Sequence, residues 1–240
     1  SALRAAPAVD VAGVEYVDEQ ALALLDEGAF ARAGVERPEA GAVLLLVQIE
    51  GSLEAFSAIL GSRGAGEGVQ VALPGDERGR AALLELREAV PAAVNRRVAE
   101  AKARVHPAIE KTAADPIVPF ERLADSLRLY RAAFDRRGLA HAIWGHISDG
   151  NLHPNVIPRS LEDVRAGREA VLEIGREVVR MGGSPLAEHG VGRSPVKQAL
   201  LRELYGDAGI DQMRAIKRAL DPEWKLAPGV IFPEGKSQMS

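Results

Sequence analysis

The sequence predicts an α+β fold in which helices pack on an antiparallel sheet in a ferredoxin-like arrangement. The first observation is a strand–helix–strand pattern over residues 42–75, which is typical of the front half of a split βαβ unit. The second is a pair of strand-like segments around Asp149-Gly150, and the third is a series of amphipathic helical patterns. A chain of 240 residues can bury one large core or two small ones.

The first of these patterns opens with the run AVLLLVQIEG at residues 42–51, which reads as a buried strand. A helix is expected from Ser52 or Leu53 to about Leu60, and the alternating segment VQVALPG at 69–75 is expected to form a second strand. The glycine-rich stretch 61–68 leads from helix to strand. Because phosphate-binding loops lead from strand to helix, we interpret it as a flexible connector.

Helical patterns account for much of the remaining chain. Residues 76–104 have helical spacing interrupted by Pro91, so either one long helix or two helices are possible. Prolines mark 106–119 as a loop, and the strands HAIWGHIS and NLHPNVIP should form a hairpin with a type I′ turn at Asp149-Gly150. Further helices are expected at 120–138, 160–183, 194–206 and 207–222, followed by an irregular tail at 223–240.

Composition excludes several classes of protein. The net charge of −4 comes from interspersed acidic and basic residues, so a nucleic acid or another polyanion is disfavoured as a partner. The chain has no cysteine, so any redox chemistry must come from a cofactor, and a cytoplasmic location is expected. No segment predicts a membrane span or a signal peptide. The first residue is Ser1, which suggests trimming and a domain missing upstream.

The stretch WGHISDGNLHP at 144–154 is the strongest candidate for a site. If Asp149 and Gly150 form a two-residue turn, His146 directly faces His153, with Cβ atoms about 5 Å apart. Two imidazoles in that position could chelate one divalent ion, although an ordinary pair of surface histidines is an equally good reading. A third ligand could come from Glu188 and His189, in the glycine-rich loop AEHGVGR.

Two cationic residues are candidates for binding a substrate carboxylate. Arg87 could do so through a bidentate fork and Lys111 as a point charge, although the alternative for both is a solvated side chain.

Three ordered motifs, GHISDGNLHP, AEHGVGR and MRAIKRALDPEWKLAPGVIF, resemble the C-terminal domain of FAD-linked oxidases. That family includes D-lactate dehydrogenases, the glycolate oxidase FAD subunit and D-2-hydroxyglutarate dehydrogenase. The resemblance covers nearly the whole chain, so residues 1–240 are expected to be one domain that covers the flavin. It implies that a separate domain binds FAD.

The resemblance also implies roles for individual residues. His146, His153 and Glu188 would bind a divalent metal, Zn or Mn, and His189 would be the catalytic base. Arg87 and Lys111 would bind the carboxylate of a small 2-hydroxy acid, and Asn151 would contact the cofactor. The expected partners are the FAD-binding domain and a second copy of the chain. The sequence departs from the family pattern at Ser148, Ala187, Ala227 and Pro91, and the last of these leaves the substrate undetermined.

Two further expectations follow. The chain alone should bind no FAD, and it should expose an apolar surface that includes residues 227–232. The competing hypothesis is a non-catalytic metal-binding or interaction module on a ferredoxin-like fold.

Overall fold

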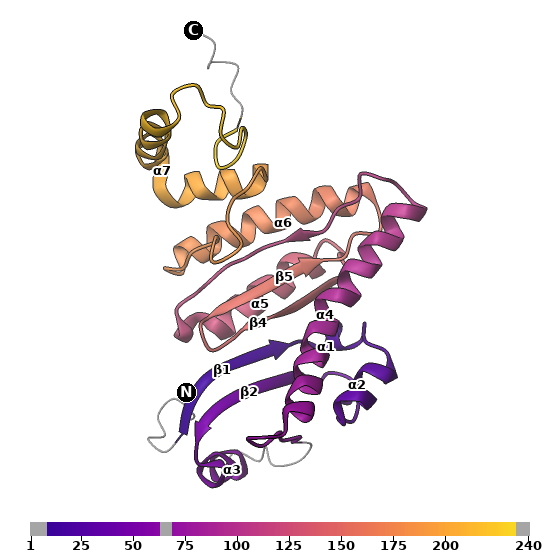
Figure 1. The fold of residues 1–240 in the computed structure, drawn as a ribbon. Coiled ribbons are helices and arrows are strands. Elements are labelled where there is room, and N and C mark those ends of the chain that lie inside the picture. The colour runs from indigo at the N-terminus through magenta and orange to yellow at the C-terminus, as the bar shows by residue number, and fades with distance from the viewer. Residues whose placement is uncertain (1–8, 63–68, 234–240) are drawn as a thin grey trace.

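The structure is a computed structural model that describes residues 9–62 and 69–233. Its centre is an antiparallel five-stranded sheet in the order β2-β1-β4-β5-β3 (Figure 1). The strands are β1 Val9–Val17, β2 Leu44–Gly51, β3 Thr112–Ala113, β4 His141–His146 and β5 Asn151–Val156. The predicted α+β class, with helices on an antiparallel sheet, is confirmed.

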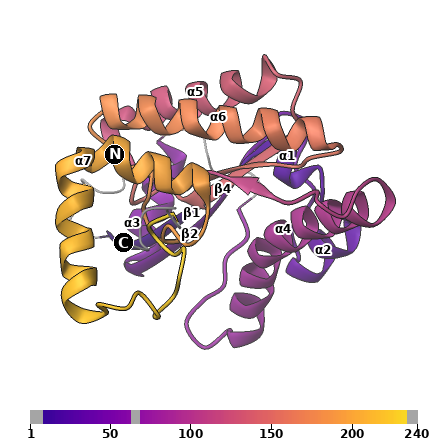
Figure 2. The same ribbon diagram turned by 90° about the horizontal axis from the view of Figure 1, so that it is seen from above.

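Helices surround this sheet on both faces (Figures 1 and 2). They are α1 Glu19–Leu22, α2 Glu27–Ala33, α3 Leu53–Gly61, α4 Glu77–Arg104, α5 Leu123–Asp135, α6 Leu161–Arg180 and α7 Pro195–Leu220, with a 3₁₀ turn at Phe120–Arg122. Most begin at a side chain that accepts a hydrogen bond from the first turn, as Ser160 does for α6.

The β4–β5 hairpin separates two apolar cores. Ile143 and Leu152 face α5 and α6, where they pack with Tyr130, Phe134 and Ile174. The next residues along β4, Ala142 and Trp144, face the opposite side and pack with α1, α2 and α4. Because strand side chains alternate, His146 and His153 lie on this second face, beside α4.

The helix over 76–104 is one continuous helix, α4, with Pro91 inside it. Of the two possibilities left open by the sequence, the single helix is therefore correct. Pro91 has no N–H to donate to the carbonyl of Arg87, and both residues line the cleft described below. Helix α7 bends at Gly206, whose φ is 67° and ψ 176°, so it consists of the two predicted helical segments.

The predicted strand at 69–75 is wrong. These residues are in no strand, and Val69, Val71 and Leu73 are 46%, 41% and 55% exposed. A strand needs a partner, and this segment does not pair with the edge strand β2 despite its alternating pattern. The connector predicted at 61–68 lies, from residue 63 onward, outside the described residues.

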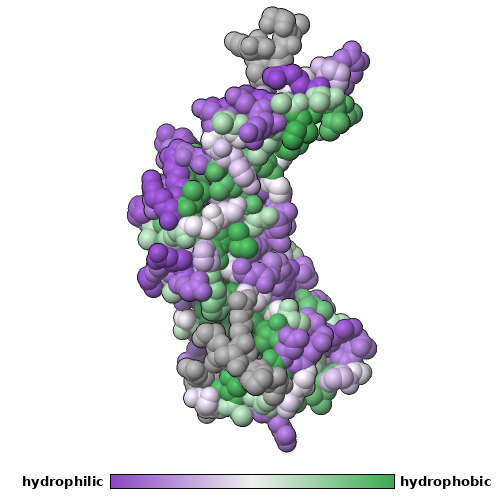
Figure 3. Space-filling view, turned by 90° about the vertical axis from the view of Figure 1, so that its left-hand side faces the viewer, coloured by the Kyte–Doolittle hydropathy of each residue, from purple (hydrophilic) through white to green (hydrophobic). Residues whose placement is uncertain are grey.

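The predicted apolar surface at 227–232 is only partly correct. Leu226 and Ile231 are 65% and 40% exposed, but Phe232 is buried against Leu201 and Ile210. Other exposed apolar residues are spread over β2, α3, α4, α6 and α7, and on the face in Figure 3 green side chains alternate with purple ones. Within residues 9–62 and 69–233, none of the helices combines the length and apolar character needed to cross a membrane.

Candidate metal and substrate site

The predicted register of the β4–β5 hairpin is wrong by two residues. His146 is paired with Asn151, and His153 is paired with Trp144, so the two histidines are diagonal neighbours on one face. Their rings still lie close, with centroids 5.7 Å apart in an edge-to-face arrangement.

The register differs because the turn contains four residues, 147–150, and not the two expected. Only Gly150 within it has positive φ, which excludes the type I′ turn. The turn is anchored from both sides: Ser148 Oγ accepts a hydrogen bond from the Val14 N–H at 3.2 Å, and Gly150 O accepts one from Val118 N–H at 3.1 Å. A Cβ at position 150 would collide with the Val118 carbonyl, which explains the glycine.

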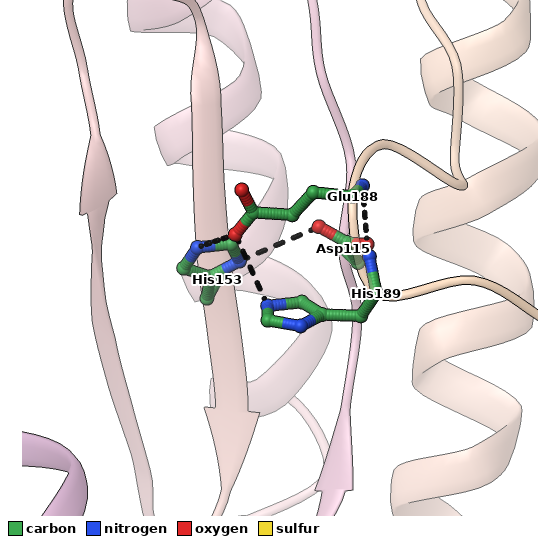
Figure 4. A group of neighbouring side chains, drawn as sticks. All are labelled: Asp115, His153, Glu188 and His189. Carbon is green, nitrogen blue, oxygen red and sulfur yellow. Dashed lines mark hydrogen bonds and ion pairs between the residues drawn. The ribbon is translucent and has the colours of Figure 1, made fainter.

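Four predicted site residues converge on one point (Figure 4 shows three of them). The Nε2 atoms of His146, His153 and His189 lie 3.7, 3.0 and 3.2 Å from Oε1 of Glu188. His153 is nearly buried, whereas Glu188 and His189 are exposed towards the cleft. The structure therefore brings the hairpin and the loop containing Glu188 and His189 together.

Asp115 holds that loop in place, and the sequence analysis did not select it. Its Oδ2 accepts hydrogen bonds from the backbone N–H groups of Glu188 at 2.9 Å and His189 at 2.7 Å. Gly190 and Gly192 then take positive φ values of 64° and 57°, which turn the chain towards α7. In the sequence, Asp115 is visible only as an acidic residue in an apolar segment next to a proline. Its position in the chain gives no indication that it lies beside residues 188–189.

Asp115 also faces the hairpin. Its Oδ1 lies 3.5 Å from Nδ1 of His153 and accepts a hydrogen bond from Asn151 Nδ2 at 3.3 Å. Burial alone would raise the pKa of Asp115, but the nearby His153 ring and the hydrogen bonds from the two loop N–H groups and Asn151 outweigh it and hold the pKa well below its usual range. Asp115 is therefore a buried, ionised carboxylate at neutral pH.

His146 has a corresponding carboxylate, which the sequence analysis also missed. Glu15 of β1 is paired with His146 across the sheet, and its Oε1 contacts His146 Nδ1. The other oxygen, Oε2, accepts a hydrogen bond from Arg87 Nε at 3.1 Å. His146 and His153 thus each have a carboxylate on the Nδ1 side and present Nε2 to Glu188.

A cleft of about 590 Å³ opens beside this cluster. His153, Glu188 and His189 line one part of it, and Arg87 and Lys111 line another. Partial burial lowers the pKa of Lys111, whose Nζ lies 5.9 Å from the Trp144 ring. Lys111 has no acidic partner among the described residues, so it is available to an anion in the cleft.

Asn151, predicted to contact the cofactor, is buried inside the site. Its Nδ2 donates to Pro116 O at 2.8 Å as well as to Asp115. Its Oδ1 is buried and has no hydrogen-bond partner among the described residues. The cofactor role stays a prediction, and in this structure Asn151 connects the hairpin to the Asp115 segment.

The donor set fits a divalent transition metal. Imidazole nitrogens with one carboxylate are typical zinc ligands, and a catalytic site has three protein ligands with a further position left open. Ligand atoms of Asp115, His153, Glu188 and His189 all lie within 4.8 Å of one another. Both oxygens of Asp115 are already engaged, so it suits an outer position better than direct ligation.

The chain belongs to the family of FAD linked oxidases, C-terminal domain, whose family model matches residues 1–231. The resemblance drawn from the three motifs is thereby confirmed. Among curated proteins, the chain is 29% identical over 229 residues to glycolate oxidase subunit GlcD of Bacillus subtilis (strain 168). The match covers 92% of this chain and 45% of that protein.

Two other relatives match the chain over shorter stretches. Identity is 29% over 130 residues to a probable mitochondrial D-lactate dehydrogenase of Danio rerio, covering 53% of this chain and 26% of that protein. The chain is 34% identical over 139 residues to D-2-hydroxyglutarate dehydrogenase of Pantoea ananatis (strain AJ13355), and the match covers 55% of this chain and 12% of that protein. The chain therefore spans less than half the length of each of these relatives.

Proposed function

We propose that this chain is the substrate-binding domain of an FAD-dependent oxidoreductase that converts a small 2-hydroxy acid, of the D-lactate or glycolate type, to the 2-oxo acid. The observation that carries the proposal is the convergence of three imidazole Nε2 atoms on Glu188 Oε1, beside a cleft whose lining includes the cationic side chains of Arg87 and Lys111. The names of the relatives, which act on glycolate, D-lactate or 2-hydroxyglutarate, support the substrate class.

His146, His153 and Glu188 would hold a divalent ion, Zn or Mn, which would lower the pKa of a substrate hydroxyl placed beside it. His189 would accept the hydroxyl proton at Nε2, since that atom faces the same point as the ligands. Neutral imidazole is required for both roles, and His189 is exposed enough to pass the proton to solvent.

Arg87 and Lys111 would bind the substrate carboxylate. Arg87 is fixed by Glu15 and by Glu88, which accepts from Nη1 at 2.5 Å, and this leaves the remaining guanidinium N–H groups for the cleft. Lys111 adds a charge without an acidic partner among the described residues. Together they would orient C2 of the substrate.

FAD would accept the hydride from C2 and would be bound mainly by another part of the protein, with Asn151 near it. Partners would be that FAD-binding domain and a further copy of the chain, in a cytoplasmic protein. Binding to nucleic acid is not expected, because the net charge is −4.

The test is turnover by the intact protein that carries this domain together with its FAD-binding part. We expect reduction of an artificial electron acceptor by glycolate or D-lactate, and a loss of at least about 100-fold in kcat for His189→Gln with FAD content unchanged. His106→Gln is the matched control, because His106 is exposed and its Nδ1 only accepts from the Ala108 N–H. A protein that binds the metal but oxidises no 2-hydroxy acid would favour the non-catalytic module.

A further inference from the structure

Glu15 lies between two parts of the site that the proposed function treats separately. It belongs to β1, at the register position directly opposite His146 on β4, so the two side chains share one face of the sheet. Arg87 reaches the same carboxylate from α4, 72 residues along the chain. Glu15 is therefore where strand, hairpin and long helix meet.

The two oxygens of Glu15 have different partners. Oε1 contacts Nδ1 of His146, and Oε2 accepts from Nε of Arg87 at 3.1 Å. The side chains of Glu15 and Arg87 are only 23% and 20% exposed, so water competes weakly for these contacts. With both acceptor atoms engaged, the carboxylate is held in one orientation.

From this arrangement we infer that Glu15 is a positioning residue that couples Arg87, which would bind the substrate carboxylate, to the metal ligand His146. The inference rests on the proposed function. A carboxylate that accepts from Nδ1–H fixes the tautomer with its lone pair on Nε2, the atom that faces Glu188 at 3.7 Å. The same carboxylate sets the guanidinium plane of Arg87. A displacement at either end therefore changes the other.

Glu15→Gln separates these two functions with little change in shape. A carboxylate has two acceptor atoms, whereas an amide has one acceptor and one donor group. The single acceptor goes to Arg87, because a hydrogen bond from a charged donor is the stronger one. The amide NH₂ then faces His146 Nδ1 and favours the opposite tautomer, in which Nε2 carries the proton.

The experiment measures Zn²⁺ affinity of this chain by calorimetry in a double-mutant cycle. We expect Glu15→Gln to weaken Zn²⁺ binding by about 10–100-fold, the usual effect of losing a partner behind a metal-bound histidine. Arg87→Met should weaken it several-fold in the wild-type background and by less than about two-fold in the Glu15→Gln background. Glu50→Gln, an exposed carboxylate on neighbouring β2, is the control and should leave the affinity unchanged.

Nitrogen-15 NMR of the His146 ring in metal-free protein gives a second measurement. Wild type should show the Nδ1–H tautomer and Glu15→Gln the Nε2–H tautomer, with circular dichroism confirming that both are folded. Glu15→Asp, too short to reach both partners, should shift the tautomer in the same direction. Additive effects of the two substitutions on Zn²⁺ affinity, or an unchanged tautomer in Glu15→Gln, would overturn the inference. If wild type binds no Zn²⁺, the proposed metal site fails, while the tautomer still decides whether Glu15 positions His146.

Discussion

The two faces of the β4–β5 hairpin are held together by different kinds of interaction. The face towards α5 and α6 is a continuous apolar core in which Ile143, Tyr130, Phe134 and Ile174 are fully buried. Beyond Trp144, the other face carries a polar cluster in which carboxylates orient histidines beside an open cleft. The first face contributes stability through burial, and the second contributes binding chemistry through a few directed contacts. Substitutions on the two faces should therefore be distinguishable.

The largest effect on stability is expected from the apolar face. Ile143→Ala removes a fully buried side chain and should lower the free energy of unfolding by about 2–5 kcal/mol. Urea denaturation monitored by circular dichroism measures this, and the folded fraction should keep its Zn²⁺ affinity. A loss of less than about 1 kcal/mol would show that this face is loosely packed.

The largest effect on binding is expected from the polar face. His153→Asn should weaken Zn²⁺ binding by more than about 100-fold, since loss of a ligand exceeds the roughly 10–100-fold effect of an outer partner. Calorimetric titration of this chain is the measurement, with His106→Gln as the matched control. Equal affinities for the two variants would remove His153 from the site.

Asp115→Asn tests the contact between the segment that contains Asp115 and the loop that contains Glu188 and His189. Because the folded-state pKa of Asp115 lies below its unfolded value of about 3.9, the carboxylate adds stability that is present above about pH 5 and is lost as the pH falls through the folded-state pKa. We expect metal-free Asp115→Asn to be about 1–3 kcal/mol less stable than wild type at pH 7, with a smaller difference at pH 3. A difference that does not depend on pH would mean that Asp115 is not ionised in the folded protein.

The smallest effect is expected at the edge of the sheet, away from both faces of the hairpin. Leu45 on β2 is apolar but 53% exposed, so Leu45→Thr should change the free energy of unfolding by no more than about 0.5 kcal/mol. A loss comparable with that of Ile143→Ala would show that β2 is covered in solution, for instance by a second copy of the chain.

The comparison of the two faces also explains what the sequence could predict. The strands and amphipathic helices around the apolar core follow from local periodicity, and β4, β5, α5 and α6 are found where they were expected. Local periodicity failed at 69–75, because a strand also needs a partner, and within residues 9–62 and 69–233 no strand pairs with this segment. It also failed in the hairpin register, which is set by contacts from Val14 and Val118, far away in the sequence.

The polar face could be predicted only in part for the same reason. His146, His153, Glu188 and His189 occur in recognisable motifs, and the structure places them together. Glu15 and Asp115 do not, because their roles depend on strand pairing with β4 and on a loop more than 70 residues away. Residues that contact a ligand carry a local signal, whereas residues that position them become visible only in three dimensions.

The central claim is that His146, His153 and Glu188 form a divalent metal site on the polar face. Anomalous X-ray diffraction from crystals of this chain soaked in Zn²⁺ tests it most directly. We predict one strong peak at about 2.0–2.2 Å from Nε2 of His146, Nε2 of His153 and an oxygen of Glu188, with Asp115 and Glu15 outside bonding distance. No peak in the cleft, or a peak bound by Asp115 and His189 without His146, would contradict this account.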